Sequence, residues 1–154
     1  ANEELIIEFC EDNDMHPVIF EAYQTVDGQR LPIYHTNVMM SIAETFAVIC
    51  VDSIDDKQER KLVVNQLKED GKELIYITEE QVNHFAGNML QVEGKDGNLY
   101  MVMSTQAFES LNNGQIKAIE KHCAILHAPL YTIEACGGGS ARCMLAEVFL
   151  PQAE

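Results

Sequence analysis

The stretch NMLQVEGKDGNLYMVMST, Asn88 to Thr105, is typical of a β-hairpin, because two strand-like apolar runs flank the turn signal Lys95-Asp96-Gly97. After it, the sequence predicts helices near 105–111 and 115–123, separated by an Asn-Asn-Gly break, and then a strand near 125–134. A hairpin, a helical crossover and a third strand together make a ββαβ unit, in which a small sheet buries one face under its helix.

The preceding part of the chain predicts the same order of elements. A short helix is expected over 2–11, and further strands are expected near 18–24, 33–42, 46–52, 72–78 and 143–150. The fold class is therefore α+β, built from two similar ββαβ units of about 55 to 60 residues each. Because repeated units share their faces with neighbours and usually need about three copies or more for stability, two units indicate a truncated array.

Two further helices are predicted from their capping signals. Asp55 followed by Gln58 is a capping-box pattern, and Gly71 supplies the stop for the helix that begins there. Thr78 followed by Gln81 repeats the pattern for a short helix that ends at Gly87. The first of these helices lies between the predicted strands 46–52 and 72–78, and the second precedes the hairpin of the second unit.

Length and charge limit the class of protein. The 154 residues suit one domain with a substantial core. No apolar run reaches the ~18 residues of a membrane span, and the acidic opening ANEELIIEFCEDND is unlike a secretory signal, so a cytoplasmic protein is expected. Lys and Arg number 10 against 25 Asp and Glu, and the formal charge of -15 argues against nucleic acid and anionic membranes as partners.

The cysteines and histidines do not suggest a metal site. Five cysteines, an odd number without a Cys-x-x-Cys pair, predict reduced thiols rather than a disulfide framework or a zinc knuckle. No histidine pair has the i, i+4 zinc spacing together with a third ligand. We therefore expect no metal and no other cofactor.

One thiol stands out as a candidate nucleophile. Cys143 follows Gly137, Gly138, Gly139 and Ser140, a run that lets a substrate approach the main chain, and Arg142 adds positive charge. Loops on rigid scaffolds often carry catalytic groups. The alternative is that the glycines merely form a tight loop and Cys143 begins a core strand as a small apolar residue.

The segment YHTNVMM holds the candidate base. If 33–42 is a strand, its period of two places His35, Asn37 and Met39 on one face. The imidazole of His35 could then exchange protons with a substrate while Asn37 orients it.

Taken together, YHTNVMM and GGGSARCMLAEVFLP strongly resemble the guanidine-modifying, or pentein, superfamily, and most closely its branch of amidinotransferase-like citrulline-utilisation hydrolases. QVNHFAGNMLQV, Gln81 to Val92, resembles the central segment of that branch, so the resemblance covers nearly the whole chain. It implies a pentein-type α/β propeller of ββαβ units around a buried site, with about two of five units present. Residues 1–154 would then be the C-terminal portion of such a domain.

The resemblance also implies roles for single residues. Cys143 matches the family nucleophile, which attacks the central carbon of a guanidinium or ureido group, and His35 matches the general acid/base. Asn37 stands where many relatives have an aspartate that grips the substrate nitrogens, and a neutral amide suits a ureido oxygen better than a carboxylate does. The remaining residues expected to line the substrate pocket are Asn88, Gly138 and Gly139.

Family members usually have a first half that supplies further carboxylates, and nothing in this sequence fills that role. The expected activity is cysteine-dependent hydrolysis of a C–N bond in a small citrulline- or arginine-like molecule. We expect turnover to be weak or absent unless an N-terminal half or another chain, a second copy included, completes the site. A related amidinotransferase and a non-catalytic fragment are the alternatives.

Overall fold

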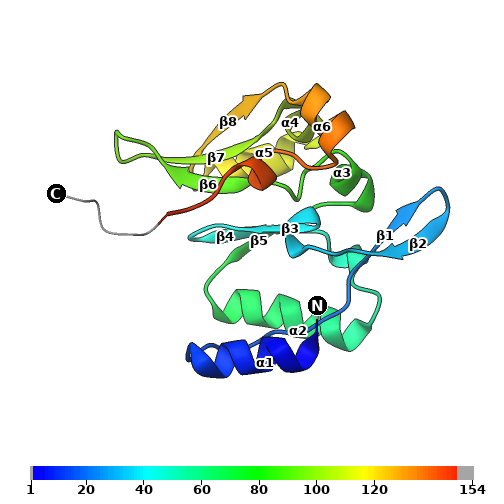
Figure 1. The fold of residues 1–154 in the computed structure, drawn as a ribbon. Helices are drawn as coiled ribbons and strands as arrows, with labels where there is room; N and C mark the ends of the chain where they lie inside the picture. The colour runs from blue at the N-terminus through cyan, green and yellow to red at the C-terminus, as the bar shows by residue number, and fades with distance from the viewer. Residues whose placement is uncertain (1, 149–154) are drawn as a thin grey trace.

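The computed structural model describes residues 2–148 (Figure 1). Within this range the chain forms two three-stranded sheets and a separate two-stranded hairpin, with helices around them. The elements are α1 (Glu3–Asp12), β1 (Tyr23–Val26), β2 (Gln29–Pro32), η1 (Thr36–Val38), β3 (Met40–Ile42), β4 (Phe46–Ile49), η2 (Val51–Ser53), α2 (Lys57–Glu69), β5 (Glu73–Tyr76), α3 (Glu79–Asn83), β6 (Leu90–Glu93), β7 (Leu99–Ser104), α4 (Thr105–Ser110), α5 (Asn113–Glu120), β8 (Ala124–Ala128), α6 (Tyr131–Gly137) and η3 (Arg142–Met144), where η marks a 3₁₀ helix.

The first sheet has the strand order β3-β4-β5. β3 pairs antiparallel with β4, and β5 returns parallel to β4 after the crossover helix α2. Asp56 caps α2 by accepting hydrogen bonds from the backbone N–H groups of Gln58 and Glu59, so the cap lies one position after the predicted Asp55. Gly71 follows the end of α2 with φ of 75°, in agreement with its predicted role as the stop.

The second sheet repeats this connection with the order β6-β7-β8. β6 and β7 form the predicted antiparallel hairpin around Lys95-Asp96-Gly97, and β8 lies parallel to β7 after α4 and α5. Each sheet therefore has the chain order strand, strand, helix, strand, and Figure 1 shows the two sheets one above the other. The predicted α+β class is confirmed, whereas the propeller with about two of five units stays a prediction.

A single hydrophobic core joins the two sheets. All four residues of β4, Phe46–Ile49, are fully buried, as expected for a strand that is covered on both faces. Met101 and Met103 of β7 and Ile119 of α5 belong to the same cluster of buried side chains. The core thus provides a rigid support for the loops at the ends of the strands.

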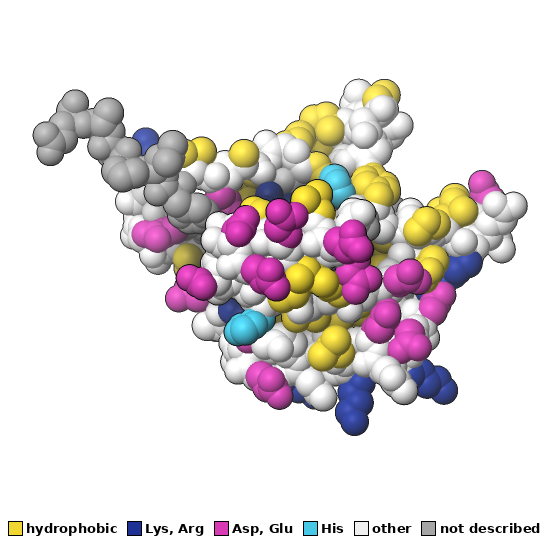
Figure 2. Space-filling model, turned by 60° about the horizontal axis from the view of Figure 1, so that its bottom comes forward, with side chains coloured by type: hydrophobic (Ala, Val, Ile, Leu, Met, Phe, Trp, Pro, Cys, Tyr) yellow, Lys and Arg dark blue, Asp and Glu magenta, His cyan; other side chains and the backbone are white. Residues whose placement is uncertain are grey.

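Acidic side chains are spread over the face of the molecule that carries α1 (Figure 2). This helix alone contributes Glu3, Glu4, Glu8, Glu11 and Asp12. A surface of this kind repels phosphate groups. Among the helices between residues 2 and 148, none has the length and apolar character needed to cross a membrane.

The strand predicted over 33–42 is wrong in its first part. The chain turns through η1 and only Met40–Ile42 is a strand. The turn packs against the loop after α3, because a Cβ at Gly87 would lie only 2.3 Å from the carbonyl oxygen of Val38. As a result His35 and Met39 do not share a strand face: Met39 is fully buried in the core, whereas His35 is exposed.

The strand predicted near 18–24 begins later, at Tyr23, and pairs with β2, which lies outside the predicted strands. Asp27 and Gly28 both have positive φ, of 50° and 75°, and form a two-residue turn that places the second strand directly after it. The strand predicted over 46–52 ends at Ile49, where η2 begins shortly afterwards.

The last two predicted strands also need correction. The strand predicted over 125–134 ends at Ala128, because Pro129 has no N–H to continue the ladder, and α6 follows. Over 143–148 the predicted final strand is wrong, since this segment holds the end of η3 and no strand. Positions 149 and 150 lie outside the described residues.

Candidate active site

A pocket of about 190 Å³ lies where three segments meet: the turn after β2, the connection from α3 to β6, and the loop after α6. All six predicted site residues line it, namely His35, Asn37, Asn88, Gly138, Gly139 and Cys143. The thiol and the imidazole, which stand far apart in the sequence, therefore face one cavity. Their catalytic roles stay predictions at this point.

Cys143 lies in the 3₁₀ turn η3 and is exposed, so the alternative of a buried cysteine that begins a core strand is wrong. Its backbone N–H donates to the carbonyl oxygen of Ser140 at 3.1 Å. Gly138 has the left-handed conformation, with φ of 67°, which favours glycine. A Cβ at Gly139 would lie 3.1 Å from the sulfur, so the absence of a side chain there leaves room for the thiol.

A buried polar pair holds the glycine loop. The hydroxyl of Ser140 is fully buried and donates to Oε1 of Glu134 at 2.6 Å. Glu134 lies in α6 and is 6% exposed, and its other oxygen, Oε2, has no hydrogen-bond partner among the described residues. Because Cys143 bonds to the backbone of Ser140, this pair links the position of the nucleophile loop to α6.

Asn88 connects the two predicted catalytic segments. Its side chain is 3% exposed, and Nδ2 donates both to the carbonyl oxygen of Asn37 and to the sulfur of Cys143, each at 3.1 Å. Its Oδ1 accepts the backbone N–H of Cys143 at 3.4 Å. Asn88 therefore holds the sulfur and the backbone of Cys143 next to the turn that carries Asn37.

His35 and Asn37 line the pocket from the turn after β2. The imidazole of His35 lies against the ring of Tyr34, with a centroid distance of 4.9 Å and an angle of 58° between the planes. Oδ1 of Asn37 is buried and accepts no hydrogen bond within the described part of the chain. A buried acceptor without a partner is costly, so it is suited to receive an N–H group from a ligand.

Six further residues line the pocket that the sequence did not single out: Gln24, Tyr34, Val38, Val82, Asn83 and Phe85. Three of them lie in the segment QVNHFAGNMLQV, so the resemblance of that segment was a usable signal. Phe85 has φ of 64°, which is rare for an aromatic residue and is typical of functional sites. The described lining contains no Asp, Glu, Lys or Arg side chain.

The other thiols differ from Cys143. Burial raises the pKa of the Cys50 and Cys123 thiols, which keeps them protonated and unreactive. Cys136 is exposed and does not belong to the lining of the pocket.

Larger hollows occur elsewhere on the surface. One of about 600 Å³ lies between α3, α4 and α5, and its described lining includes no cysteine. Within residues 2–148, no group of three or more His, Cys, Asp or Glu side chains is arranged to hold a metal ion. The smaller pocket is the one that brings together the predicted nucleophile Cys143 and the predicted base His35.

Residues 1–150 match a protein-family model described as "N,N dimethylarginine dimethylhydrolase, eukaryotic". A search of curated proteins found no significant match. The matched range covers every residue of the pocket.

Two solved structures of ArgZ, an arginine dihydrolase from the ornithine-ammonia cycle in cyanobacteria, are similar to this chain. The apo structure has a TM-score of 0.66 at 14% identity, and the match covers 99% of this chain and 22% of that one. The N-terminal domain, a cysteine-to-serine mutant bound to its substrate, has a TM-score of 0.63 at 14% identity, over 92% of this chain and 46% of that one. At this identity the likeness concerns the fold alone, and the chain spans less than half the length of either structure.

Proposed function

Because the chain belongs to the family of eukaryotic N,N-dimethylarginine dimethylhydrolases, and so to the guanidine-modifying pentein proteins, we propose that it carries the nucleophile and the general base of a guanidino hydrolase. The substrate is a small molecule with a substituted guanidino group, such as a methylated arginine or arginine itself. One observation carries the proposal: the sulfur of Cys143 and the imidazole of His35 line the same pocket.

The reaction proceeds in two balanced steps. In the first, the thiolate of Cys143 attacks the central guanidino carbon, a C–S bond forms, and the C–N bond to the departing amine breaks as the imidazolium of His35 gives that amine a proton. In the second, neutral His35 takes a proton from water as the oxygen attacks the same carbon, and the C–S bond breaks. The products are an amine and a ureido compound, and both side chains return to their starting states.

The other predicted residues support these steps. Asn88 holds the sulfur in position for the attack with a hydrogen bond from its Nδ2. Oδ1 of Asn37, which has no partner among the described residues, accepts an N–H of the bound planar group. Gly138 and Gly139 leave the space next to the sulfur open, so that the flat group can lie against the main chain.

We further propose that residues 1–154 are the C-terminal portion of a larger pentein domain. The chain spans 22% and 46% of the two solved structures that it resembles. No carboxylate among the described residues lines the pocket, although a cationic guanidinium needs a counter-charge when it is desolvated. A further segment or another chain would supply it, and alone this chain would turn over slowly or not at all.

A ureido substrate such as citrulline is the second candidate. The amide-containing, uncharged lining is the observation that favours it, because amides can both donate to a neutral carbonyl oxygen and accept from its N–H groups. A related amidinotransferase would use the same two catalytic side chains, with an amine in place of water.

The test compares three proteins: the parent, Cys143→Ser and the matched control Cys136→Ser, which removes the other exposed thiol. Each is made as the 154-residue chain and, where the reading frame continues upstream, as the longer protein. They are incubated with N,N-dimethylarginine, arginine or citrulline, and with arginine plus glycine. We expect amine release and a covalent adduct on Cys143 by mass spectrometry, both lost in Cys143→Ser only.

Undiminished hydrolysis by Cys143→Ser would refute the proposal, as would an absence of turnover and of adduct in the longer protein. Faster release of amine from citrulline than from the guanidino compounds would assign the second candidate. A guanidino product from glycine would assign the transferase.

A further inference from the structure

The hairpin β1–β2 is held in place by very few elements of the fold. Within the described chain its two strands pair only with each other, and all four residues of β2 are exposed. Figure 1 shows the hairpin extending from the side of the molecule. An isolated two-stranded hairpin is at best marginally stable in water, so contacts outside the strands must fix its position.

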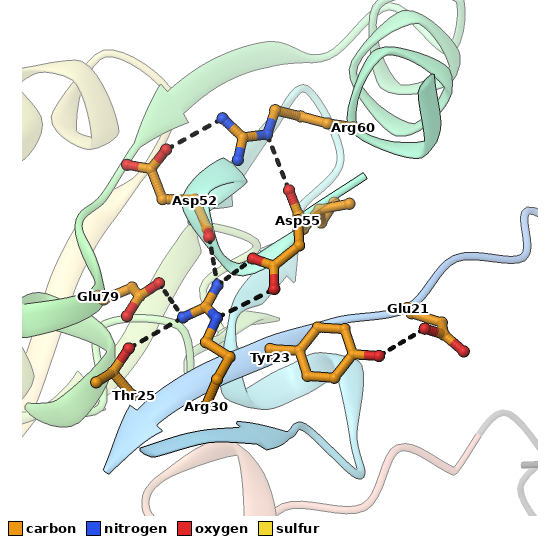
Figure 3. Close-up of polar contacts among 9 residues, drawn as sticks. Glu21, Tyr23, Thr25, Arg30, Asp52, Asp55, Arg60 and Glu79 are labelled. Carbon is orange, nitrogen blue, oxygen red and sulfur yellow. Dashed lines mark hydrogen bonds and ion pairs between the residues drawn. The ribbon is translucent and has the colours of Figure 1, made fainter. Parts of the chain in front are cut away.

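Arg30, on β2, provides these contacts (Figure 3). Nε and Nη2 donate to the two carboxylate oxygens of Asp55 at 3.2 and 2.6 Å, a bidentate arrangement. Nη2 also donates to the carbonyl oxygen of Asp52 at 2.8 Å. Nη1 donates to the carboxylate of Glu79 and to the hydroxyl of Thr25, on the paired strand. One guanidinium therefore binds four residues of three separate segments.

These segments form two walls of the pocket. On one side, the hairpin carries Gln24 and leads within a few residues to Tyr34 and His35, all of which line the cavity. On the other side, Glu79 is the first residue of α3, whose later residues Val82 and Asn83 also line it. Arg30 joins the first residue of α3 to the hairpin. Its hydrogen bonds to Asp55 also attach both elements to the loop between η2 and α2.

We propose that Arg30 is a positioning residue, which fixes the wall that carries His35 at a set distance from the wall formed by α3. Its effect on turnover rests on the proposed function, whereas its effect on the two walls does not. Arg30 is not among the described residues that line the pocket, and none of its hydrogen bonds goes to one of them. It therefore acts through the hairpin and α3. This role explains why Asp55 is not the cap of α2: its carboxylate is engaged by Arg30.

The chemistry of the site requires arginine. The planar guanidinium places its N–H groups in a fixed fork, which fits the bidentate carboxylate and the additional acceptors at once, and a lysine ammonium cannot reproduce this geometry. Simple exposed ion pairs contribute little to stability, but the side chain of Arg30 is only 30% exposed and its network is shared between segments. The hydrogen bond that Arg30 donates to Asp55 is the largest influence that raises the pKa of Arg30, and the group stays charged.

The experiment compares Arg30→Gln and Arg30→Lys with the matched control Arg60→Gln. Arg60 is similarly exposed and bonds to the Asp52 carboxylate and the Ile54 carbonyl, next to the same cluster, but contacts no hairpin residue through these bonds. Amide hydrogen exchange of residues 23–35 and 79–85 is measured for the whole chain. We expect exchange in both segments to rise roughly tenfold in the two Arg30 variants and to stay unchanged in Arg60→Gln.

Two kinetic readouts separate positioning from general loss of structure. The rate of Cys143 alkylation by iodoacetamide should be unchanged in Arg30→Gln, since the thiol is held by Asn88 and the glycine loop. With N,N-dimethylarginine as substrate, kcat/KM should fall roughly tenfold, chiefly through kcat, because a displaced His35 slows proton transfer.

The proposal is overturned if hydrogen exchange rises in neither segment or in only one of them, or if Arg60→Gln matches Arg30→Gln. Full rescue by Arg30→Lys would equally overturn it, because a point charge would then suffice. If the longer protein shows neither turnover nor an adduct on Cys143, the proposed function fails, and the exchange comparison still decides the role of Arg30 in holding the walls.

Discussion

Replacing Asn88 by aspartate tests the electrostatics of the site most directly. Nδ2 of Asn88 donates to the sulfur of Cys143 and to the carbonyl oxygen of Asn37. In Asn88→Asp a carboxylate oxygen takes the place of this donor. It then faces the sulfur of Cys143 and the carbonyl oxygen of Asn37, and it has no hydrogen to donate to either. A thiolate at Cys143 then meets a like charge at the former hydrogen-bond distance, and the uncharged thiol is favoured.

The magnitude follows from the distance of 3.1 Å between the two atoms. Two unit charges at this separation repel by about 5 kcal/mol at an effective dielectric constant near 20 and by about 1.3 kcal/mol in bulk water. Because Cys143 is exposed, the lower part of this range applies. The lost donor to the charged sulfur adds about 1.5 kcal/mol, and each 1.4 kcal/mol is a factor of about ten.

We therefore expect iodoacetamide to alkylate Cys143 about tenfold more slowly in Asn88→Ala, which only removes the donor, and about a hundredfold more slowly in Asn88→Asp. The rates are read by peptide mass spectrometry as a ratio to Cys136, the other exposed thiol. The buried thiols of Cys50 and Cys123 report on folding, because they are alkylated only if the chain opens.

An equal ratio of Cys143 to Cys136 alkylation in the parent and both variants, with the buried thiols protected, would refute the reasoning. The order of the two variants matters as much as the size of the effect. If Asn88→Ala were the slower one, charge repulsion would not be the cause. The experiment needs no turnover and therefore applies to the chain even if a further segment completes the site.

Three further outcomes are expected. Gly139→Ala places a Cβ 3.1 Å from the sulfur of Cys143, closer than an ordinary contact, so the thiol shifts by a few tenths of an ångström. We expect kcat to fall about tenfold, while the circular dichroism spectrum shows that the fold is kept. An unchanged kcat would contradict this. Ser140→Ala removes the only described donor to a buried carboxylate and should lower the free energy of unfolding in urea by about 1 to 3 kcal/mol, and a loss below about 0.5 kcal/mol would oppose it. The hydrogen bond from Arg30 lowers the pKa of Asp55 below its ordinary 3.8, so the stability that the pair contributes is present above about pH 4 and is lost as the pH falls further. Below about pH 4 the midpoint of urea unfolding should therefore drop more steeply in the parent than in Asp55→Asn. Equal slopes in the two proteins would argue against a contribution from the pair.

Local signals predicted those parts of the fold that depend on neighbouring residues. The turn at Lys95-Asp96-Gly97 and the capping box of Thr78 and Gln81 appear in the structure as expected, because each is closed by hydrogen bonds over a few positions. The strand expected over 33–42 failed for the opposite reason. Its first half is held as a turn by Gly87, about fifty positions away, and no local pattern contains that contact.

The site shows the same division. The glycines before Cys143 indicated a close approach to the main chain, and Gly139 indeed leaves the space next to the sulfur. The strand face that was to hold His35 and Asn37 does not exist, yet both line the pocket, since the prediction drew on the resemblance of two segments as well as on the strand period. Gln24 lines the pocket from the short hairpin, whose second strand lies between the strands predicted at 18–24 and 33–42.

The contacts of Asn88 explain why the family resemblance rests on three segments at once, namely those that contain His35, Asn88 and Cys143. The amide of Asn88 donates to the carbonyl oxygen of Asn37, two positions after His35, and to the sulfur of Cys143. Both segments must therefore keep their geometry for the two bonds to form together. The preceding Gly87 must lack a side chain, since a Cβ there would collide with Val38. Only an amide can give a donor to the two acceptors and accept the cysteine N–H at once, because a carboxylate has no donor and a hydroxyl has only one hydrogen. The central segment therefore links the segment of the predicted base to that of the predicted nucleophile, and a chain that keeps all three segments keeps their relative position.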